Sequence, residues 1–279
     1  MKTMLLFLLV IIVSAVFTTC GGRPDEPEKE VHEVPFAAIA PVIDGIGNDA
    51  AWEKAKWRPI NQVWLGGGNA SETNLSPPPA GTFSGWYKIV WTEDSLYFLV
   101  EIMDTHLSLN RIADPYDEIF NDDCLELFIN EEAKGGNHEA NNIAFAYHLS
   151  YDGESVMDYV AGRGNTGPFQ NNYINRSHHV KYKIGNLDLP NKKSISGNNV
   201  YIWETEMKVF NKNYPINGNS DYTPETLYEG KEIGYAVAYC NAGPSKKREY
   251  FMGSVFIPGI KKNVAYQDAS VFGKMKLVK

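Results

Sequence analysis

The chain has 279 residues, of which 43% are hydrophobic and 13% aromatic, and its formal net charge is −8. This length and composition suit one large all-β domain or two small globular domains. Its clearest basic run is Lys246-Lys247-Arg248, which gives no extended positive surface for phosphate backbones and argues against nucleic acid as a partner.

The first residues have the features of an export signal. Lys2 precedes an apolar run over residues 4–17 that is too short to span a bilayer comfortably, so residues 1–19 read as a signal peptide. Cys20 follows directly, as at a bacterial lipoprotein cleavage site, and we expect it to carry lipid. The alternative is an ordinary signal peptide or an uncleaved anchor. The prediction is a cell-envelope lipoprotein of the outer membrane, facing the periplasm or the outside and held to the membrane through Cys20.

Residues 20–35 are rich in Gly, Pro and charge without an apolar period, which predicts a flexible acidic tether. Residues 36–279 contain no internal repeat and are expected to form one domain. With Cys20 lipidated, Cys124 and Cys240 remain, and a disulfide between them or two buried free thiols fit the sequence equally well. Their spacing matches no CxxC or Cys/His zinc motif.

The sequence of this domain predicts an antiparallel β-sandwich with long loops and little helix. The reason is that short stretches typical of β-strands alternate with turn residues, namely Gly, Asn, Pro and Asp. One helical turn is expected at 49–55, capped by Asn48 or Asp49. Long loops are expected at 61–85 and 161–178. The expected strands cover 41–45, 86–91 and 96–103 as a hairpin, 124–129, 145–151, 200–209, 232–240, 250–256 and 273–277.

The stretch FNDDCLELFIN contains the most informative of these strands. Side chains alternate across a strand, so Cys124 and Glu126 share one face while Leu125 and Leu127 share the apolar face that suits a core. An unpaired carboxylate in mid-strand is costly to bury. Glu126 therefore needs an Arg or Lys partner, which is the ordinary arrangement, or a polar ligand.

Six motifs follow one another in a familiar order. They are IDGIGNDAAWEKA (43–55), WTEDSLYFLVEIMD (91–104), NDDCLELFIN (121–130), YIWETEM (201–207), EIGYAVAYCN (232–241) and DASVFGKMKL (268–277). Together they resemble the family 9 carbohydrate-binding modules over about residues 36–279. The resemblance implies a β-sandwich that binds sugars such as xylan or cellulose fragments without cleaving them. It also implies polysaccharide-degrading enzymes as partners and, in some members, structural calcium.

The resemblance also implies a set of ligand-binding residues. Two aromatic rings that clamp a sugar correspond to Phe120 and Tyr266, and the family's sugar-bonding Glu corresponds to Glu126. Asn263 aligns with a polar residue at the rim, and His148 takes the place of the family's Arg on the next strand. Aromatic faces suit the C–H patches of sugars, and carboxylate or amide groups suit their hydroxyls.

This chain departs from the family pattern in three ways. Phe120 and Tyr266 replace the usual Trp rings, and His148 replaces a permanently charged Arg. The Trp that the family usually places near Met252 is absent. A surface scaffold whose sugar site has decayed is therefore one alternative function.

A glycoside hydrolase is another alternative. The acids Asp117, Glu118, Asp122, Asp123 and Glu126 cluster within ten residues, and hydrolysis uses a pair of carboxyls. Such a pair must face across a cleft, which proximity in sequence does not establish. We therefore favour a charged loop with one paired strand acid.

Two further features bear on ligands. Asp44, Asp49, Asp122 and Asp123 could offer oxygen ligands to calcium, although the spaced D-x-D-x-D loop with a terminal Glu is missing. Trp64, next to a run of three glycines, is expected to pack in the protein, with contact to a ligand as the less favoured role.

Overall fold

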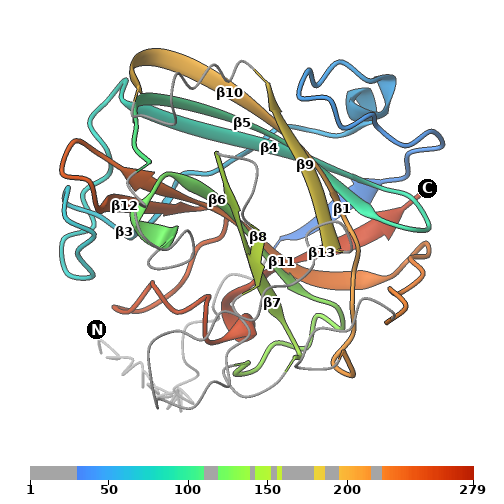
Figure 1. Cartoon of the computed structure of the whole chain (residues 1–279). Coiled ribbons are helices and arrows are strands. Elements are labelled where there is room, and N and C mark those ends of the chain that lie inside the picture. The colour runs from blue at the N-terminus through green and yellow to red at the C-terminus, as the bar shows by residue number, and fades with distance from the viewer. Residues whose placement is uncertain are drawn as a thin grey trace, which may run out of the picture.

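The computed structural model describes residues 30–109, 119–138, 142–151, 156–158, 179–185, 195–214 and 222–279, with the backbone alone at 156–158 and 195–198. These residues form two β-sheets that pack face to face, so the predicted sandwich is confirmed (Figure 1). Three short 3-10 helices connect strands. They are η1 (Ala50–Lys54), η2 (Ile119–Asn121) and η4 (Ala269–Val271).

The larger sheet has eight strands in the order β1-β13-β11-β6-β7-β8, and β12 pairs with both β11 and β3. The pairing of β1 with β13 is parallel, whereas β6 pairs antiparallel with both of its neighbours. The strands are β1 (Val31–Pro35), β3 (Gln62–Leu65), β6 (Cys124–Asn130), β7 (Phe145–Ser150), β8 (Val156–Asp158), β11 (Glu232–Ala242), β12 (Arg248–Gly253) and β13 (Gly273–Val278).

The smaller sheet has five antiparallel strands in the order β2-β4-β5-β10-β9. Its predicted hairpin is confirmed: Trp91 pairs with Leu96, and the amide of Thr92 donates to the carbonyl of Ser95 at 3.0 Å. The strands are β2 (Arg58–Pro59), β4 (Phe83–Trp91), β5 (Leu96–Leu107), β9 (Val180–Gly185) and β10 (Ile195–Met207).

The main core lies between the two sheets, because alternate side chains of each strand point inward. From β6 it receives Leu125, Leu127 and Ile129, none more than 2% exposed. Trp91 and Trp203 of the smaller sheet are fully buried in the same core. The apolar face predicted for β6 is therefore the core face.

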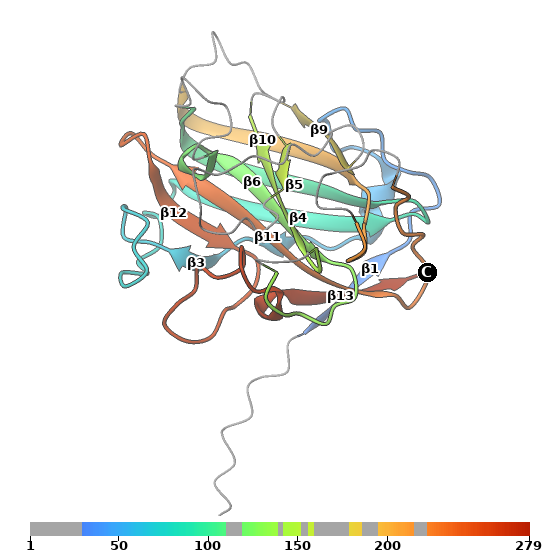
Figure 2. The ribbon, with the colours of Figure 1, turned by 60° about the horizontal axis from the view of Figure 1, so that its bottom comes forward.

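The opposite face of β6 is also covered. Cys124 and Phe128 belong to a second buried cluster on the outer side of the larger sheet, which we call the outer cluster. Residues 254–272, the connection from β12 to β13, contribute Ala265 to it, and β3 contributes Trp64 (Figure 2). A polar group on this face of β6 therefore lies between a sheet and a covering segment.

A third cluster packs η1 against the outer side of the smaller sheet. Its polar anchor is Glu204 of β10, which accepts hydrogen bonds from the amides of Asp44 (3.1 Å) and Gly45 (2.7 Å) and from Trp52 Nε1 (3.2 Å). Gly45 has a φ of +83°, and a Cβ there would lie 2.6 Å from the amide nitrogen of Gly185. Only glycine fits this close approach, which explains the Asp-Gly step of the first motif.

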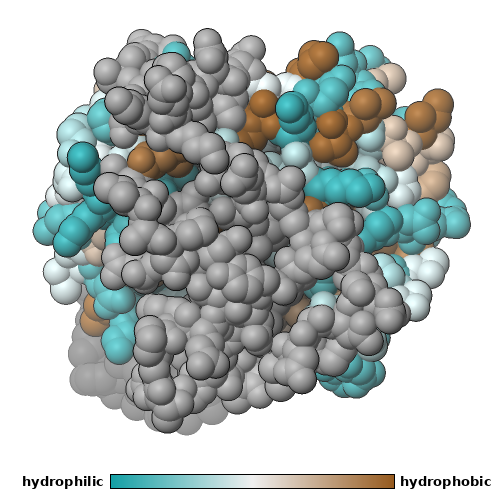
Figure 3. Space-filling view, in the orientation of Figure 1, coloured by the Kyte–Doolittle hydropathy of each residue, from teal (hydrophilic) through white to brown (hydrophobic). Residues whose placement is uncertain are grey.

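The same segment exposes several apolar side chains. Ile39, Val42 and Ile46 are 82%, 60% and 61% exposed. Figure 3 shows hydrophobic surface at the corner where this segment lies. The segment is thus held to the sheet by its bonds to Glu204 and by Trp52, and not by burial of all its own apolar residues.

The prediction of a flexible tether over residues 20–35 was wrong for its last five residues. Val31–Pro35 form β1, with His32 4% and Val34 0% exposed, because the alternation in VHEVP fits the edge of the larger sheet. Cys20 and the predicted signal peptide lie outside the described residues. No helix in the described part of the chain has the length and apolar character needed to cross a membrane.

Two loop and strand predictions also need correction. Residues 41–45 form no strand, because the amides of Asp44 and Gly45 bond to Glu204 and that of Val42 bonds to Asp49, and none bonds to the backbone of a neighbouring strand. The loop predicted at 61–85 contains β3 and the start of β4, which the surrounding Gly, Asn and Pro residues obscured. The loop predicted at 161–178 lies outside the described residues.

Candidate functional site

The candidate site is built around Glu126, whose backbone lies at the centre of the larger sheet. Its neighbours across the two ladders are His148 on β7 and Ala238 on β11. Glu126 is 3% exposed and His148 is 5% exposed. The strand pairing therefore places a carboxylate and an imidazole side by side under the covering segment.

The Glu126 carboxylate is held by two close donors. Nε2 of His148 lies 3.2 Å from Oε1, and Sγ of Cys240 donates to the same oxygen at 2.9 Å. Burial acts to raise the pKa of Glu126, but attraction to His148 and Arg248 and these hydrogen bonds lower it overall below its usual value. Glu126 is therefore ionised at neutral pH, and its second oxygen is not engaged by either donor.

Arg248 is part of this site, and sequence reasoning missed it. Its guanidinium carbon lies 5.1 Å from the ring centre of Phe120 and 4.8 Å from that of Phe251, and Nη1 donates to Sγ of Cys240 at 3.4 Å. A cation between two aromatic faces is held in a fixed orientation. Arg248 thus supplies the permanently charged fork that His148 lacks.

The two rings predicted to clamp a ligand lie on the same face. Phe120, in η2, and Tyr266, in the segment that covers the sheet, are both half-buried and both pack against the outer cluster. Asn263 lies in the same segment and is half-buried. No side-chain hydrogen bond joins Asn263 to another described residue, so it is the predicted site residue with the weakest connection to Glu126.

Trp64 packs in the interior. Its side chain is 0% exposed, its Nε1 donates to the carbonyl of Val255 at 3.0 Å, and its ring meets Phe251 edge to face at 5.1 Å. Gly253 makes room for it, since a Cβ there would lie 2.1 Å from the indole ring. The expected packing role is thus confirmed.

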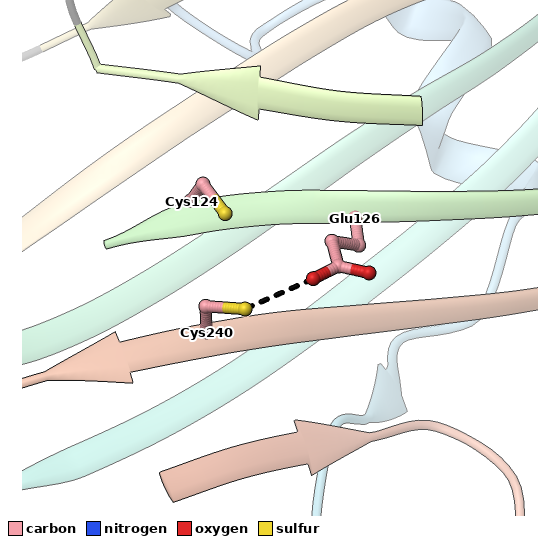
Figure 4. A group of neighbouring side chains, drawn as sticks. All are labelled: Cys124, Glu126 and Cys240. Carbon is pink, nitrogen blue, oxygen red and sulfur yellow. Dashed lines mark hydrogen bonds between the residues drawn. The ribbon is translucent and has the colours of Figure 1, made fainter. Parts of the chain in front are cut away.

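Cys124 and Cys240 are both free thiols and both fully buried. They face each other across the β6–β11 ladder. Figure 4 shows their side chains and that of Glu126 directed toward one another, and their ligand atoms all lie within 4.8 Å. Of the two alternatives that the sequence left open, the structure contains the free thiols.

The aspartates considered for calcium do not converge in the described structure. Asp44 and Asp49 accept the amides of Ile46 and Val42 in the segment that carries η1. Asp123 lies elsewhere, at the start of β6 and fully buried. Among the described residues, the one group of three or more potential metal-binding side chains is the Cys124–Glu126–Cys240 set.

A second pair of acids lies on the inner side of the sheet. Asp104 accepts the amide of His106 at 2.9 Å and Nδ2 of Asn241 at 3.0 Å, and Asp123 accepts the amide of Ala242 at 2.8 Å. Burial raises the pKa of Asp104 to about 7. Burial and the neighbouring Asp104 raise the pKa of Asp123 well above its usual value.

These two acids do not form the pair that glycoside hydrolysis requires. Asp104 and Asp123 are 3% and 0% exposed, so they do not face an open cleft. The groups that shift the pKa of Glu126 most are His148, Arg248 and Cys240, and none is a carboxyl. Asp117 and Glu118 lie outside the described residues.

The chain belongs to the family described as carbohydrate family 9 binding domain-like, which matches residues 43–279. The search of curated proteins gave no match.

Two similar solved structures are of a family 9 carbohydrate-binding module from Caldicellulosiruptor kristjanssonii, in complex with cellotriose and with glucose. The first is 17% identical with a TM-score of 0.59 and covers 89% of this chain and 94% of the module. The second is 17% identical with a TM-score of 0.57 and covers 88% and 95%. At this identity, the similarity supports the fold.

Proposed function

We propose that this domain binds carbohydrate without cleaving it, on the outer face of the larger sheet. The observation that carries the proposal is the state of Glu126. It is an ionised carboxylate held through Oε1 by His148 and Cys240, next to a face that presents Phe120 and Tyr266. Oε2 is the oxygen that would accept sugar hydroxyls, and the rings would stack on the sugar.

Arg248 extends this site. Its guanidinium is fixed between Phe120 and Phe251, so it loses little conformational entropy when it donates to a ligand. His148 would donate from the neighbouring strand, and Asn263 would reach a hydroxyl at the rim. We therefore assign Phe120, Glu126, His148, Asn263 and Tyr266 to the site, with Arg248 added from its position.

The ligand class follows from the relatives. The Caldicellulosiruptor kristjanssonii module was solved with cellotriose and with glucose, which are β-1,4-linked and single glucose units. We propose plant polysaccharide fragments of this kind, such as cellulose or xylan oligosaccharides, as the ligand. Catalysis is not part of the proposal, because the groups that shift the pKa of Glu126 include no second carboxyl that could act as its acid or base partner.

The experiment is a binding assay of the protein against xylan, cellulose and their oligosaccharides, with reducing ends measured in parallel. Binding without release of reducing sugar is expected. Tyr266→Ala should lower affinity about fivefold or more, because stacking of a sugar on one aromatic ring contributes on the order of 1 kcal/mol or more. Tyr228→Ala is the matched control, since Tyr228 is 60% exposed and lies outside the outer cluster.

Three results would count against the proposal. Release of reducing sugar would favour the hydrolase alternative, and a folded protein that binds none of the glycans would favour the scaffold with a decayed site. Equal loss of affinity in Tyr266→Ala and Tyr228→Ala would remove the assignment of the ring.

We also propose that the domain is an exported lipoprotein of the bacterial cell envelope, acting beside polysaccharide-degrading enzymes. The support is the apolar run followed by Cys20. Labelled palmitate should enter the wild-type protein in bacterial cells and should not enter Cys20→Ser. Equal labelling of both would exclude Cys20 as the lipid site.

A further inference from the structure

The two buried cysteines lie where a metal ion would be held. Cys124 on β6 and Cys240 on β11 are opposite each other in the ladder, and Glu126 follows Cys124 by two residues on the same face. The two thiol sulfurs and a carboxylate oxygen all lie within 4.8 Å of one another (Figure 4). Strand pairing thus creates a set of ligands that no local sequence motif shows.

The spacing is close to that of a tetrahedral site. Zinc bonds of about 2.0–2.3 Å to nitrogen, oxygen and sulfur place neighbouring ligand atoms about 3.3–3.8 Å apart. The Cys240 sulfur lies 2.9 Å from Oε1 of Glu126, and Nε2 of His148 lies 3.2 Å from the same oxygen. Cys124, Cys240 and Glu126 are already close together, whereas His148 approaches only Glu126 and must move toward the sulfurs to complete a four-coordinate site.

The charges of the site are also compatible with a divalent cation. With the metal bound, two thiolates and a carboxylate would carry three negative charges, and Arg248 beside Cys240 contributes one positive charge. A divalent ion makes the buried group neutral, which a site this closed requires. Arg248 would then donate to a thiolate ligand at its present position, 3.4 Å from the sulfur.

From these observations, we propose that Cys124, Cys240, Glu126 and His148 bind one Zn²⁺ ion. Thiolate and imidazole ligands select zinc over calcium or magnesium, which prefer oxygen. On binding, the ion forms two Zn–S bonds and the two thiol protons leave to solvent. The site goes beyond sugar binding and does not depend on it, although Glu126 and His148 take part in both.

A disulfide would use the same two sulfurs. Its formation would remove the S–H that donates to Oε1 of Glu126 and would exclude the metal. The two outcomes are therefore mutually exclusive in one molecule and can be separated by the redox state of the purified chain.

The test uses the full-length protein, reduced and freed of metal with a chelator. After addition of Zn²⁺ and removal of the excess, we expect about one zinc per chain by elemental analysis. Replacement of zinc by Co²⁺ should give the sulfur-to-cobalt charge-transfer absorption of thiolate coordination. Zinc should also protect both buried thiols of the wild-type protein from alkylation, a readout that needs no variant.

The variants identify the ligands. Cys124→Ser and Cys240→Ser should each lose the retained zinc and the cobalt absorption, with folding checked by circular dichroism. Cys20→Ser is the matched control and should retain both. His148→Gln should lower the zinc affinity about 10- to 100-fold. Tyr266→Ala should retain zinc while losing sugar, which separates this proposal from the proposed function.

Two results would overturn the zinc site. One is a reduced wild-type protein that retains no zinc and shows no charge-transfer absorption. The other is a folded Cys124→Ser or Cys240→Ser protein that retains as much zinc as Cys20→Ser.

Discussion

Buried acids on the two sides of the larger sheet are in opposite states. On the outer face, Glu126 is ionised with a lowered pKa, whereas on the inner side Asp104 and Asp123 have raised pKa values. The exposed fractions are similar, at 3%, 3% and 0%. Burial alone therefore does not decide the charge of an acid in this sandwich.

The difference lies in the neighbours. Glu126 is close to a histidine and an arginine, both of which favour the charged form. The donors to Asp104 and Asp123 are neutral amides and the Tyr239 hydroxyl, and the two acids also repel each other. Arg248 thus lies on the face that we assign to ligand binding, where an ionised acceptor is useful.

The largest expected effect is the pH dependence caused by Asp104. Its folded pKa of about 7 exceeds its unfolded value, so the folded protein binds the extra proton and stability falls as pH rises from about 4 to about 7. Asp104→Asn removes this dependence. The free energy of unfolding of the variant relative to wild type should increase over that range by on the order of 2–4 kcal/mol.

This measurement compares two proteins at each pH, in urea unfolding experiments. Contributions of groups that do not interact with Asp104, such as His32, whose pKa is lowered to about 3 by burial and by Arg58, cancel in the difference. A difference that stays constant with pH would mean that Asp104 is ionised in the folded state, and the contrast between the two faces would be lost.

Loss of Arg248 should have the next largest effect. Arg248→Met removes two cation–π contacts and the hydrogen bond to Cys240. It also removes a positive charge that stabilises the buried carboxylate of Glu126. A loss of about 2–3 kcal/mol in unfolding free energy is expected. The matched control is Lys247→Met, because Lys247 is exposed and adjacent in sequence. Similar values for the two variants would show that Arg248 does not support the charge of Glu126.

Local features of this fold were predictable from sequence. The alternation of β6, the hairpin of β4 and β5 and the turn at η1 depend on neighbouring residues, and all three are confirmed. The need of Glu126 for a partner also followed, although its close donors are His148 and Cys240 and not the expected Arg or Lys. The Asp-Gly step of the first motif was visible, although its reason, the contact with Gly185, was not.

Features that depend on strand register were not predictable. Cys124 and Cys240 meet because β6 and β11 pair in one particular register. Hydrophobic alternation alone does not specify this register, because sliding one strand by two residues keeps the same side chains facing the core. Arg248 reaches Phe120 through the pairing of β12 with β11, far from β6 in sequence. For the same reason β1 was assigned to a tether, since its partner β13 lies at the other end of the chain.

The smallest of these effects should come from Glu126→Gln, and its sign completes the contrast with Asp104. Because the folded pKa of Glu126 is lowered, its ionised form adds stability above its unfolded pKa of about 4.3 and loses it as pH falls through the folded value. The variant should be less stable than wild type by about 1–2 kcal/mol at neutral pH, with the deficit shrinking in acid. Urea unfolding at several pH values measures this, and sugar binding should be lost at all of them. A deficit that grows in acid would place Glu126 in the same class as Asp104 and would remove the ionised acceptor from the proposed site.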